Sequence, residues 1–327
     1  MLYGDTDSML KCCKVAHYLL AVLPFTVRTG IGGMALEAPY TLAPLKLGME
    51  VRGIDLRRDI PETVIEHIKR DVLKHRILVF RDQGVVSGDR QVEISGWFGP
   101  LESTFYKHHK SPHPDVFRVS NSDAEGCRGV GRTGWHIDGS FQPAPFSFAI
   151  YHIWSVPSKG STDFVPLTEL IEQLSLEERK RWERLWMLSD RRAGRCHPLI
   201  YSHPITGKRV LCFHLGMTEA FVYDYGTENE RITDWQESVR LLKEIHFEII
   251  KNNRSMIYEH QWKAGDFIIS DNLAVGHEAN PNTQLPPDEV GLRVMHRCTV
   301  KGYRAPTKDY DVKKELKELE KRAKDEL

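Results

Sequence analysis

The sequence predicts an α+β fold with a sandwich or a rolled sheet of short strands at its centre. Segments with helical periodicity come before and between runs of short, β-branched strands, instead of alternating strictly with them. Hydrophobic residues make up 41% and charged residues 28% of the 327 residues, close to the averages of globular proteins. The chain can therefore bury a substantial core, and its length favours one large domain with additions.

The first elements that the sequence predicts are a helix and a buried strand. Pro61 stands where the first residue of a helix is expected. The apolar residues that then recur at helical spacing are Val64, Ile65, Ile68, Val72 and Leu73. "RILVF" (76–80) and "FAIYHIWSV" (148–156) are apolar runs rich in β-branched and aromatic residues, so each predicts a strand.

Two helix starts and two turns organise the middle of the chain. Ser175 with Glu178, and Thr233 with Gln236, have the spacing of capping boxes and predict the start of two helices. "HPITGKRVLCF" (203–213) predicts a turn that leads into a strand. "SMIYEHQW", "KAGD" and "FIISDN" (255–272) together predict a hairpin with a four-residue loop.

The composition excludes several classes of protein. Lysine plus arginine and aspartate plus glutamate each total 45, so no net charge attracts the chain to nucleic acid or an anionic membrane. The six cysteines contain no CxxC pair, which argues against a zinc ribbon or a disulfide framework. No apolar run approaches the roughly 20 residues that span a bilayer. We therefore expect a small-molecule partner, no nucleic acid and no integral membrane segment, while a homo-oligomer stays open.

The two ends of the chain differ from its centre. We interpret residues 1–43 as an N-terminal appendage, in which the apolar stretch 15–27 resembles a weak signal segment. Residues 304–327 predict a charged helix that ends in Lys-Asp-Glu-Leu, the retention signal of the endoplasmic reticulum. Because a helix rich in lysine and glutamate can end in these letters by chance, we expect the cytoplasm, with the lumen of the endoplasmic reticulum as the alternative.

Candidate metal ligands stand in "GWHIDGSF" (134–141) and in "SDNLAVGHEA" (270–279). On a strand, His136 and Asp138 project to the same face because they are two residues apart. His277, just past a predicted strand, is the best candidate for a third ligand. Two histidines and one carboxylate form the facial triad of non-haem iron(II) oxygenases, which leaves coordination positions open. The His-x-Asp pair alone is common by chance and does not establish a site.

Two arginines in "GLRVMHRCTV" (291–300) strengthen this interpretation. Arg293 and Arg297 share one face of an otherwise apolar strand. A buried arginine needs an anion, and its planar fork suits a carboxylate. Their Cα atoms would be about 13 Å apart, so the two could serve different anionic groups. Salt bridges to acidic residues elsewhere in the chain remain the alternative for either arginine.

The order of these motifs resembles a known family. The matching segments are "HID" at 136–138, "PSKGSTDF" with Thr162, "DNLAVGHEA" with His277, "LRVMHR" at 292–297, "LGMEVRGIDL", "LVFRDQ", "FGPLE" and "HPITGKRVLCFHLGMT". In the order that they have along the chain, these segments resemble the TauD/TfdA family, the taurine and 2,4-dichlorophenoxyacetate dioxygenases that depend on iron(II) and 2-oxoglutarate. The resemblance spans residues 44–303, which we interpret as the dioxygenase domain.

The resemblance carries expectations for the fold and the site. It implies a double-stranded β-helix, or jelly-roll, core with flanking helices. It also implies Fe(II) bound by His136, Asp138 and His277, and 2-oxoglutarate bound by Thr162 and Arg293. By the same resemblance, Arg297 would bind an anionic group of the substrate. The expected reaction uses O2, converts 2-oxoglutarate to succinate and CO2, and hydroxylates a small, anionic organic substrate.

Departures from the family narrow the substrate but leave alternatives open. Residues 103–114 and Arg132 do not match the taurine enzyme's substrate contacts, and the loop 280–291 is longer, so we expect a substrate other than taurine. Because Asp138 is present, whereas related halogenases lack this carboxylate, hydroxylation is favoured over halogenation. Trp135 and Phe141 could wall the pocket or belong to the plain core. Desaturation, C–N or C–S cleavage, and a non-catalytic binding protein remain the alternatives.

Overall fold

A seven-stranded sheet carries much of the structure. The computed structural model describes residues 39–102, 107–130, 134–190 and 196–325. The order of the strands in this sheet is β1 (Thr41–Pro44), β2 (Met49–Arg52), β3 (Ile77–Phe80), β14 (Phe267–Asp271), β5 (Phe148–Ser155), β16 (Val294–Thr299) and β4 (Phe117–Ser120). The β2 and β3 strands are parallel, and the other neighbours in this sheet are antiparallel.

Three smaller sheets and several helices complete the described part. The three-stranded sheet has the order β13 (Tyr258–His260), β6 (Thr162–Pro166) and β15 (Val275–Ala279). The four-stranded sheet has the order β12 (Arg231–Ile232), β11 (Thr218–Tyr223), β7 (Leu185–Ser189) and β8 (Cys196–Pro198), and β10 (Arg209–Leu211) pairs with β9 (Ile200–Ser202). The helices are α1 (Glu62–His75), α2 (Gly88–Gly96), α3 (Leu167–Glu172), α4 (Leu176–Glu183), α5 (Trp235–Arg254), α6 (Pro287–Val290), α7 (Val312–Asp325) and the 3-10 turn η1 (Pro281–Gln284).

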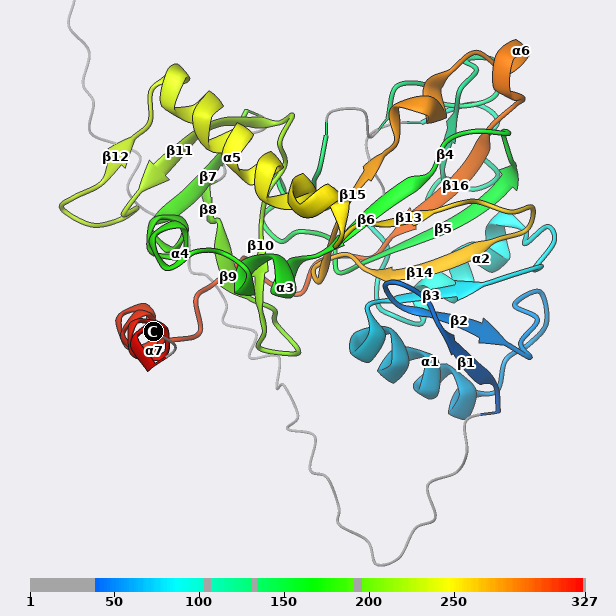
Figure 1. Cartoon of the computed structure of the whole chain (residues 1–327). Helices are drawn as coiled ribbons and strands as arrows, with labels where there is room; N and C mark the ends of the chain where they lie inside the picture. The colour runs from blue at the N-terminus through cyan, green and yellow to red at the C-terminus, as the bar shows by residue number, and fades with distance from the viewer. Residues whose placement is uncertain (1–38, 103–106, 131–133, 191–195, 326–327) are drawn as a thin grey trace, which may run out of the picture. The chain divides into compact units, whose positions relative to one another are not determined.

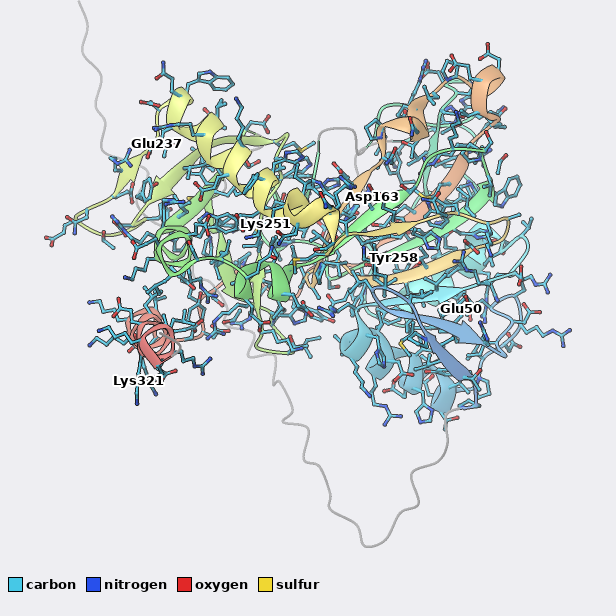
Figure 2. All side chains as sticks on the ribbon, in the orientation of Figure 1. Glu50, Asp163, Glu237, Lys251, Tyr258 and Lys321 are labelled. Carbon is cyan, nitrogen blue, oxygen red and sulfur yellow. The ribbon has the colours of Figure 1, made fainter. Side chains whose placement is uncertain are left out.

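The period-two alternation of the strands divides the core of the large sheet between its two faces. On β3, Leu78 and Phe80 pack in one apolar cluster with α1 and α2, whereas Ile77 and Val79 pack in another with β6, β13 and β15. Helices α1 and α2 therefore cover one face of the sheet, and the three-stranded sheet covers the other (Figure 1). Figure 2 shows side chains of this second layer, with Asp163 on β6 and Tyr258 on β13.

A third apolar cluster joins α3, α4 and α5 to the four-stranded and two-stranded sheets. Leu170, Trp182 and Ile245 contribute from the helices. The cluster also contains Trp135 and Ile137, which are both fully buried. These two residues alternate with His136 and Asp138 along the chain, so packing on one side of this segment directs the polar side chains to the other.

Several predicted elements are confirmed. The predicted strands at 76–80 and 148–156 are β3 and β5, and the turn at 203–208 leads into β10. Ser175 and Glu178 form the predicted capping box at the start of α4. The described residues are mixed helix and strand with several sheets, which agrees with the predicted α+β class.

Two helix starts and one hairpin differ from the predictions. Pro61 is the N-cap of α1 and not its first residue, because its ψ of 143° is extended. Asp234, and not Thr233, caps α5, because the Thr233 hydroxyl is bonded to the backbone of Phe221. The predicted hairpin at 255–272 is wrong, since β13 pairs with β6 while β14 pairs with β3 and β5.

Some predictions concern residues outside the described ranges. The apolar stretch 15–27, Arg132 and the last two residues of the terminal tetrapeptide all lie there. Across the part of the chain that is described, no helix is both long and apolar enough to cross a bilayer.

Candidate metal centre

Three predicted ligands, separated by up to 141 positions in the sequence, converge in the interior. His136 Nε2 is 3.9 Å from Asp138 Oδ1, and His277 Nε2 is 3.6 Å from Asp138 Oδ2. One ligand atom from each of the three residues lies within 4.8 Å of the others. All three residues are buried, at 5% to 6% exposure. This arrangement has the donor set and the compactness of a facial triad.

Backbone pairing places the two histidines beside each other. His136 and His277 are antiparallel bridge partners, and each donates its N–H to the carbonyl of the other, at 3.0 and 2.8 Å. His277 belongs to β15, whereas His136 forms an isolated bridge that precedes a turn, so the segment 136–138 is not the regular strand that we predicted. The two ring centroids lie 4.4 Å apart.

Asn272 holds the turn that presents Asp138. The Asn272 Oδ1 atom accepts from the Asp138 N–H at 2.9 Å, and Asn272 Nδ2 donates to the Asp138 carbonyl at 3.0 Å and to the Phe146 carbonyl at 2.7 Å. Gly139 follows with φ of 74°, where a Cβ would meet the Phe146 ring at 2.9 Å. Glycine is therefore required directly after the carboxylate ligand.

The electrostatics favour neutral imidazoles and an ionised carboxylate. Burial lowers the pKa of His136, and burial followed by the neighbouring His136 lowers the pKa of His277 to about 3. The His136 Nδ1 donates to the Gly134 carbonyl at 2.7 Å, so in the neutral ring Nε2 carries the lone pair. Burial acts to raise the pKa of Asp138, but Arg297 and then the nearby histidines bring it below its ordinary value.

The donor set fits a divalent metal ion. Neutral imidazole nitrogen and ionised carboxylate oxygen are the forms that coordinate metals. Within the described ranges, the buried Asp138 Oδ2 atom has no hydrogen-bond partner. An uncompensated buried carboxylate oxygen is costly unless a cation or a donor reaches it. The residues present therefore suit iron(II) in chemistry and in arrangement.

The two predicted arginines occupy different environments. Arg293 is 1% exposed, and neither its Nε nor its Nη1 has a hydrogen-bond partner in the part of the structure described; burial lowers its pKa to about 10. Arg297 donates from Nη1 to Asp138 Oδ1 at 2.7 Å, and its guanidinium lies 5.0 Å from the centre of the Phe117 ring. Arg293 thus has unused donors for an anion, whereas Arg297 already contacts a metal ligand.

Thr162, the predicted partner of Arg293, begins strand β6 and is 4% exposed. Its Oγ1 accepts a hydrogen bond from Trp262 Nε1 at 3.0 Å. Trp262 lies in the apolar cluster between the seven-stranded and three-stranded sheets, together with Met295, which follows Arg293 by two residues. An indole N–H only donates, so the hydroxyl hydrogen of Thr162 stays available for an acceptor.

The two aromatic candidates lie in unlike environments. Trp135 is fully buried in the cluster that contains Phe213 and Leu199. This placement agrees with the alternative that Trp135 belongs to the plain core. Phe141 is only partly buried and lies in the turn that begins at Asp138.

Two further polar residues at the site were missed by sequence reasoning. The His214 ring stacks on the His136 ring at 4.5 Å, because these residues are also bridge partners. The Tyr151 hydroxyl lies 3.3 Å from His277 Nε2, and burial raises the Tyr151 pKa well above its ordinary value, which keeps the phenol protonated. His214 stood inside a matched motif, but only the strand pairing shows that it reaches the ligands.

Comparisons with known proteins agree with this geometry. The family model "Taurine catabolism dioxygenase TauD, TfdA family" matches residues 41–299. The chain is 26% identical over 261 residues to the alpha-ketoglutarate-dependent 2,4-dichlorophenoxyacetate dioxygenase of Cupriavidus pinatubonensis, covering 69% of this chain and 86% of the relative. It is 22% identical over 299 residues to the alpha-ketoglutarate-dependent sulfate ester dioxygenase of Pseudomonas putida, covering 82% and 91%.

A solved structure shares the fold. The crystal structure of a taurine dioxygenase from Burkholderia xenovorans has a TM-score of 0.65 and 24% identity, covering 84% of this chain and 97% of that one. Because the family model spans most of the chain and the three buried ligands converge, the chain belongs to the TauD/TfdA family and is a 2-oxoglutarate-dependent non-haem iron dioxygenase that uses Fe(II), 2-oxoglutarate and O2.

Proposed function

We propose that this dioxygenase hydroxylates a small organic molecule carrying an anionic group, with Fe(II) bound by His136, Asp138 and His277. The observation that carries the proposal is the convergence of these three buried ligands beside Arg297. When bound, iron and 2-oxoglutarate supply the oxidising chemistry, in which O2 converts 2-oxoglutarate to succinate and CO2 and one oxygen atom enters the substrate.

The protein residues prepare the ligands for this chemistry. His136 and His277 stay neutral because they are buried, so their lone pairs remain available over the physiological pH range. Arg297 holds Asp138 Oδ1 in place and favours its ionised form. The low exposure of all three ligands keeps bulk water away from the reacting groups.

Arg293 and Thr162 form the proposed anchor for the distal carboxylate of 2-oxoglutarate. A buried guanidinium with unused donors calls for an anion, and a carboxylate accepts from its planar fork. The Thr162 hydroxyl can add a third donor because its oxygen already accepts from Trp262.

Arg297 is the proposed anchor for the substrate anion. Its Nη1 donates to Asp138, while its Nε is buried and has no partner within the described residues. The relatives named above act, by name, on 2,4-dichlorophenoxyacetate and on sulfate esters, which are anions. We also propose that Phe141 contacts the substrate. Trp135 would act only indirectly, by packing behind the metal ligands.

The finer architecture belongs to the same proposal. We propose that the seven-stranded and three-stranded sheets form a double-stranded β-helix, since they enclose one apolar layer between them. Residues 44–303 would be the dioxygenase domain, residues 1–43 an appendage and 304–327 a charged tail containing α7. A cytoplasmic location remains our proposal, and the endoplasmic reticulum lumen the alternative.

The metal and cosubstrate sites can be tested without a substrate. Anaerobic addition of Fe(II) and 2-oxoglutarate should give a metal-to-ligand charge-transfer absorption band in the purified protein. We expect His277→Ala to lose the band and His246→Ala, an exposed residue on α5, to keep it. If the unaltered protein gives no band, the non-catalytic binding protein becomes the better interpretation.

The substrate can be sought by its effect on turnover. Candidate acids and their uncharged analogues are screened for succinate formation above the uncoupled background, and the products then separate hydroxylation from desaturation or cleavage. Because Arg297 also holds Asp138, Arg297→Ala should weaken catalysis with every substrate, but the affinity for charged substrates should fall further. Equal losses for charged and uncharged substrates would rule out the anion anchor.

A further inference from the structure

Asn121, directly after β4, bonds through both polar atoms of its side chain to the backbone of Arg293 and of the loop 281–291. Its Oδ1 accepts from the Arg293 N–H at 2.8 Å. Its Nδ2 donates to the Leu285 carbonyl at 2.9 Å and to the Gly291 carbonyl at 3.0 Å. Asn121 is 1% exposed, so these bonds are made away from water. One amide group therefore connects the backbone of Arg293 to the loop 281–291.

The backbone of Arg293 depends on side chains for its position. Arg293 stands just before β16, and the pairing of β16 with β5 shifts between Val294 and Met295. On one side the Arg293 N–H is held by Asn121, and on the other its carbonyl accepts from Ser120 Oγ at 2.6 Å. Two consecutive residues, Ser120 and Asn121, thus fix the backbone of Arg293. Its guanidinium donates from Nη2 to Met295 Sδ at 3.5 Å, and its Nε and Nη1 have no partner among the described residues.

The loop 281–291 is held at separate points and not by a regular ladder. It contains η1 and the four-residue α6. Besides Asn121, Gln284 Oε1 accepts from the Gly129 N–H at 2.9 Å, and Ser158 donates to the Val290 carbonyl. Because the loop has few regular backbone hydrogen bonds, we expect it to open locally at a lower free energy than the strands beside it, although Thr283, Gln284 and Val290 are buried. Of the contacts named here, only that of Asn121 also reaches Arg293.

We propose that Asn121 is a positioning residue that couples the loop 281–291 to the cosubstrate anchor. When the loop is seated, Asn121 sets the backbone of Arg293 so that the guanidinium meets the distal carboxylate of 2-oxoglutarate. Binding of that carboxylate in turn favours the seated loop, because the coupling between two sites is reciprocal. The inference rests on the proposed role of Arg293 in cosubstrate binding.

Asn121→Asp separates the two functions of the amide. The carboxylate keeps an acceptor for the Arg293 N–H but has no donors for the carbonyls of Leu285 and Gly291. We expect the affinity of the iron-loaded protein for 2-oxoglutarate, titrated anaerobically by the charge-transfer band, to fall roughly tenfold. At saturating 2-oxoglutarate the intensity of the band should return to that of the unaltered protein.

Hydrogen exchange of the loop provides the second readout. In the unaltered protein, 2-oxoglutarate should slow amide exchange across residues 281–291, and in Asn121→Asp this protection should disappear. Gln284→Ala is the matched control, because it releases another loop contact without touching Arg293; its affinity for 2-oxoglutarate should stay within about twofold.

Three outcomes would contradict the coupling. The first is an unchanged affinity for 2-oxoglutarate in Asn121→Asp, and the second is an equal loss of that affinity in Gln284→Ala. The third is that 2-oxoglutarate does not protect the loop from exchange in the unaltered protein, a measurement that does not depend on the folding of a variant. Arg293→Gln tests the underlying proposal separately. If this variant binds 2-oxoglutarate normally, the anchor itself is wrong; if it fails to bind while Asn121→Asp binds normally, only the coupling is wrong.

Discussion

At the scale of single residues, Asn272 supports the metal site without contacting the metal, because its side chain is already hydrogen-bonded to the backbone. All three of its bonds go to backbone atoms of Asp138 and Phe146. The side chain is 1% exposed, so water cannot replace these bonds at low cost. Residues that hold ligands in this way commonly contribute strongly to metal affinity.

Asn272→Ala should therefore weaken both the fold and the metal site. We expect the free energy of unfolding to fall by about 2 to 3 kcal/mol, because buried donors and acceptors lose their partners. The affinity for Fe(II) should fall about 10- to 100-fold. Urea unfolding and an anaerobic iron titration measure the two effects. Iron affinity equal to that of the unaltered protein would show that the turn holds Asp138 without Asn272.

His152 predicts a pH dependence of stability that is separate from the metal site. Its Nε2 accepts from the Val86 N–H at 3.1 Å and its Nδ1 donates to the Asp266 carbonyl, so both nitrogens require a neutral ring. Burial lowers the pKa of His152 below its ordinary value of 6.5. The unfolded chain then takes up the proton first as the pH falls, and the stabilisation, complete above pH 6.5, is lost below it.

His152→Gln should reduce this pH dependence. Urea unfolding at pH 7.5 and pH 5.5 compares the variant with the unaltered protein, in which other buried histidines contribute in the same direction. We expect the variant to be less stable at the higher pH but to lose less stability on acidification. The difference is at most about 1.4 kcal/mol per pH unit for one proton. Identical pH slopes would mean that His152 is protonated in the folded state.

The residues of the site differ in how far the sequence could predict them. His136, Asp138 and His277 were predicted to meet because their residue types and order match a known chemistry, and the structure brings them together. Tyr151 and His214 could not be predicted as neighbours of the ligands, because their positions depend on which strands pair. Strand pairing is a long-range property that a local pattern does not contain.

At the scale of elements, a buried ionic cluster attaches the tail before α7 to α4. Glu183 is 4% exposed and accepts from Arg179 Nε at 3.0 Å, from Lys308 Nζ at 2.7 Å and from the Tyr310 hydroxyl at 2.8 Å. On α7, Glu315 pairs with Arg179 and Arg209. No residue of α7 is buried, and Glu320 of α7 also pairs with Lys180 of α4 at 2.9 Å, so ion pairs contribute to its attachment.

Glu183→Gln should loosen this attachment. Removing one partner of a buried ion pair leaves charge uncompensated, and we expect a loss of about 3 kcal/mol in the free energy of unfolding. Trypsin should then cleave faster on α7, where the exposed Lys321 points away from the molecule (Figure 2). Glu320→Gln, which breaks an exposed pair with Lys180, is the control and should cost under about 1 kcal/mol. Equal losses of stability in the two variants would contradict the expectation that the buried ion pair contributes more than the exposed one.

The incorrect hairpin prediction at 255–272 shows that local patterns can predict strands without predicting which strands pair. The local signals were correct, because strands flank a turn in which the Asp266 N–H donates to the Lys263 carbonyl. The partners of those strands were wrong, since the chain crosses here from the three-stranded to the seven-stranded sheet. The residues of β14 are all buried, whereas β13 alternates buried and exposed residues, and neither pattern specifies which neighbour a strand joins.

At the scale of the whole molecule, the sequence predicted the class of fold but not its layers. Composition and periodicity indicated mixed helices and strands around a central sheet. The division of β3 between two apolar clusters could not be assigned, because a strand with four buried residues in succession shows no alternation of polarity. Only the neighbours on each face distinguish its two sides.

Metal binding should stabilise the whole folded chain, since its ligands come from segments that are far apart in the sequence. At a free Fe(II) concentration of about 100 times Kd, the free energy of unfolding should rise by about 2.7 kcal/mol. Anaerobic thermal unfolding should show an increase in Tm that a chelator reverses and that is absent in His277→Ala. An equal increase in that variant would assign the stabilisation to another site.

Because His136 and His277 are joined by two backbone hydrogen bonds, the complete triad forms only when β15 pairs in the correct register. If β15 slipped by a single position along its neighbours, Gly276 or Glu278 would stand where the imidazole belongs. No partial version of the centre survives such an error. The iron content of a preparation would then measure the fraction of molecules in which these segments have paired in the correct register.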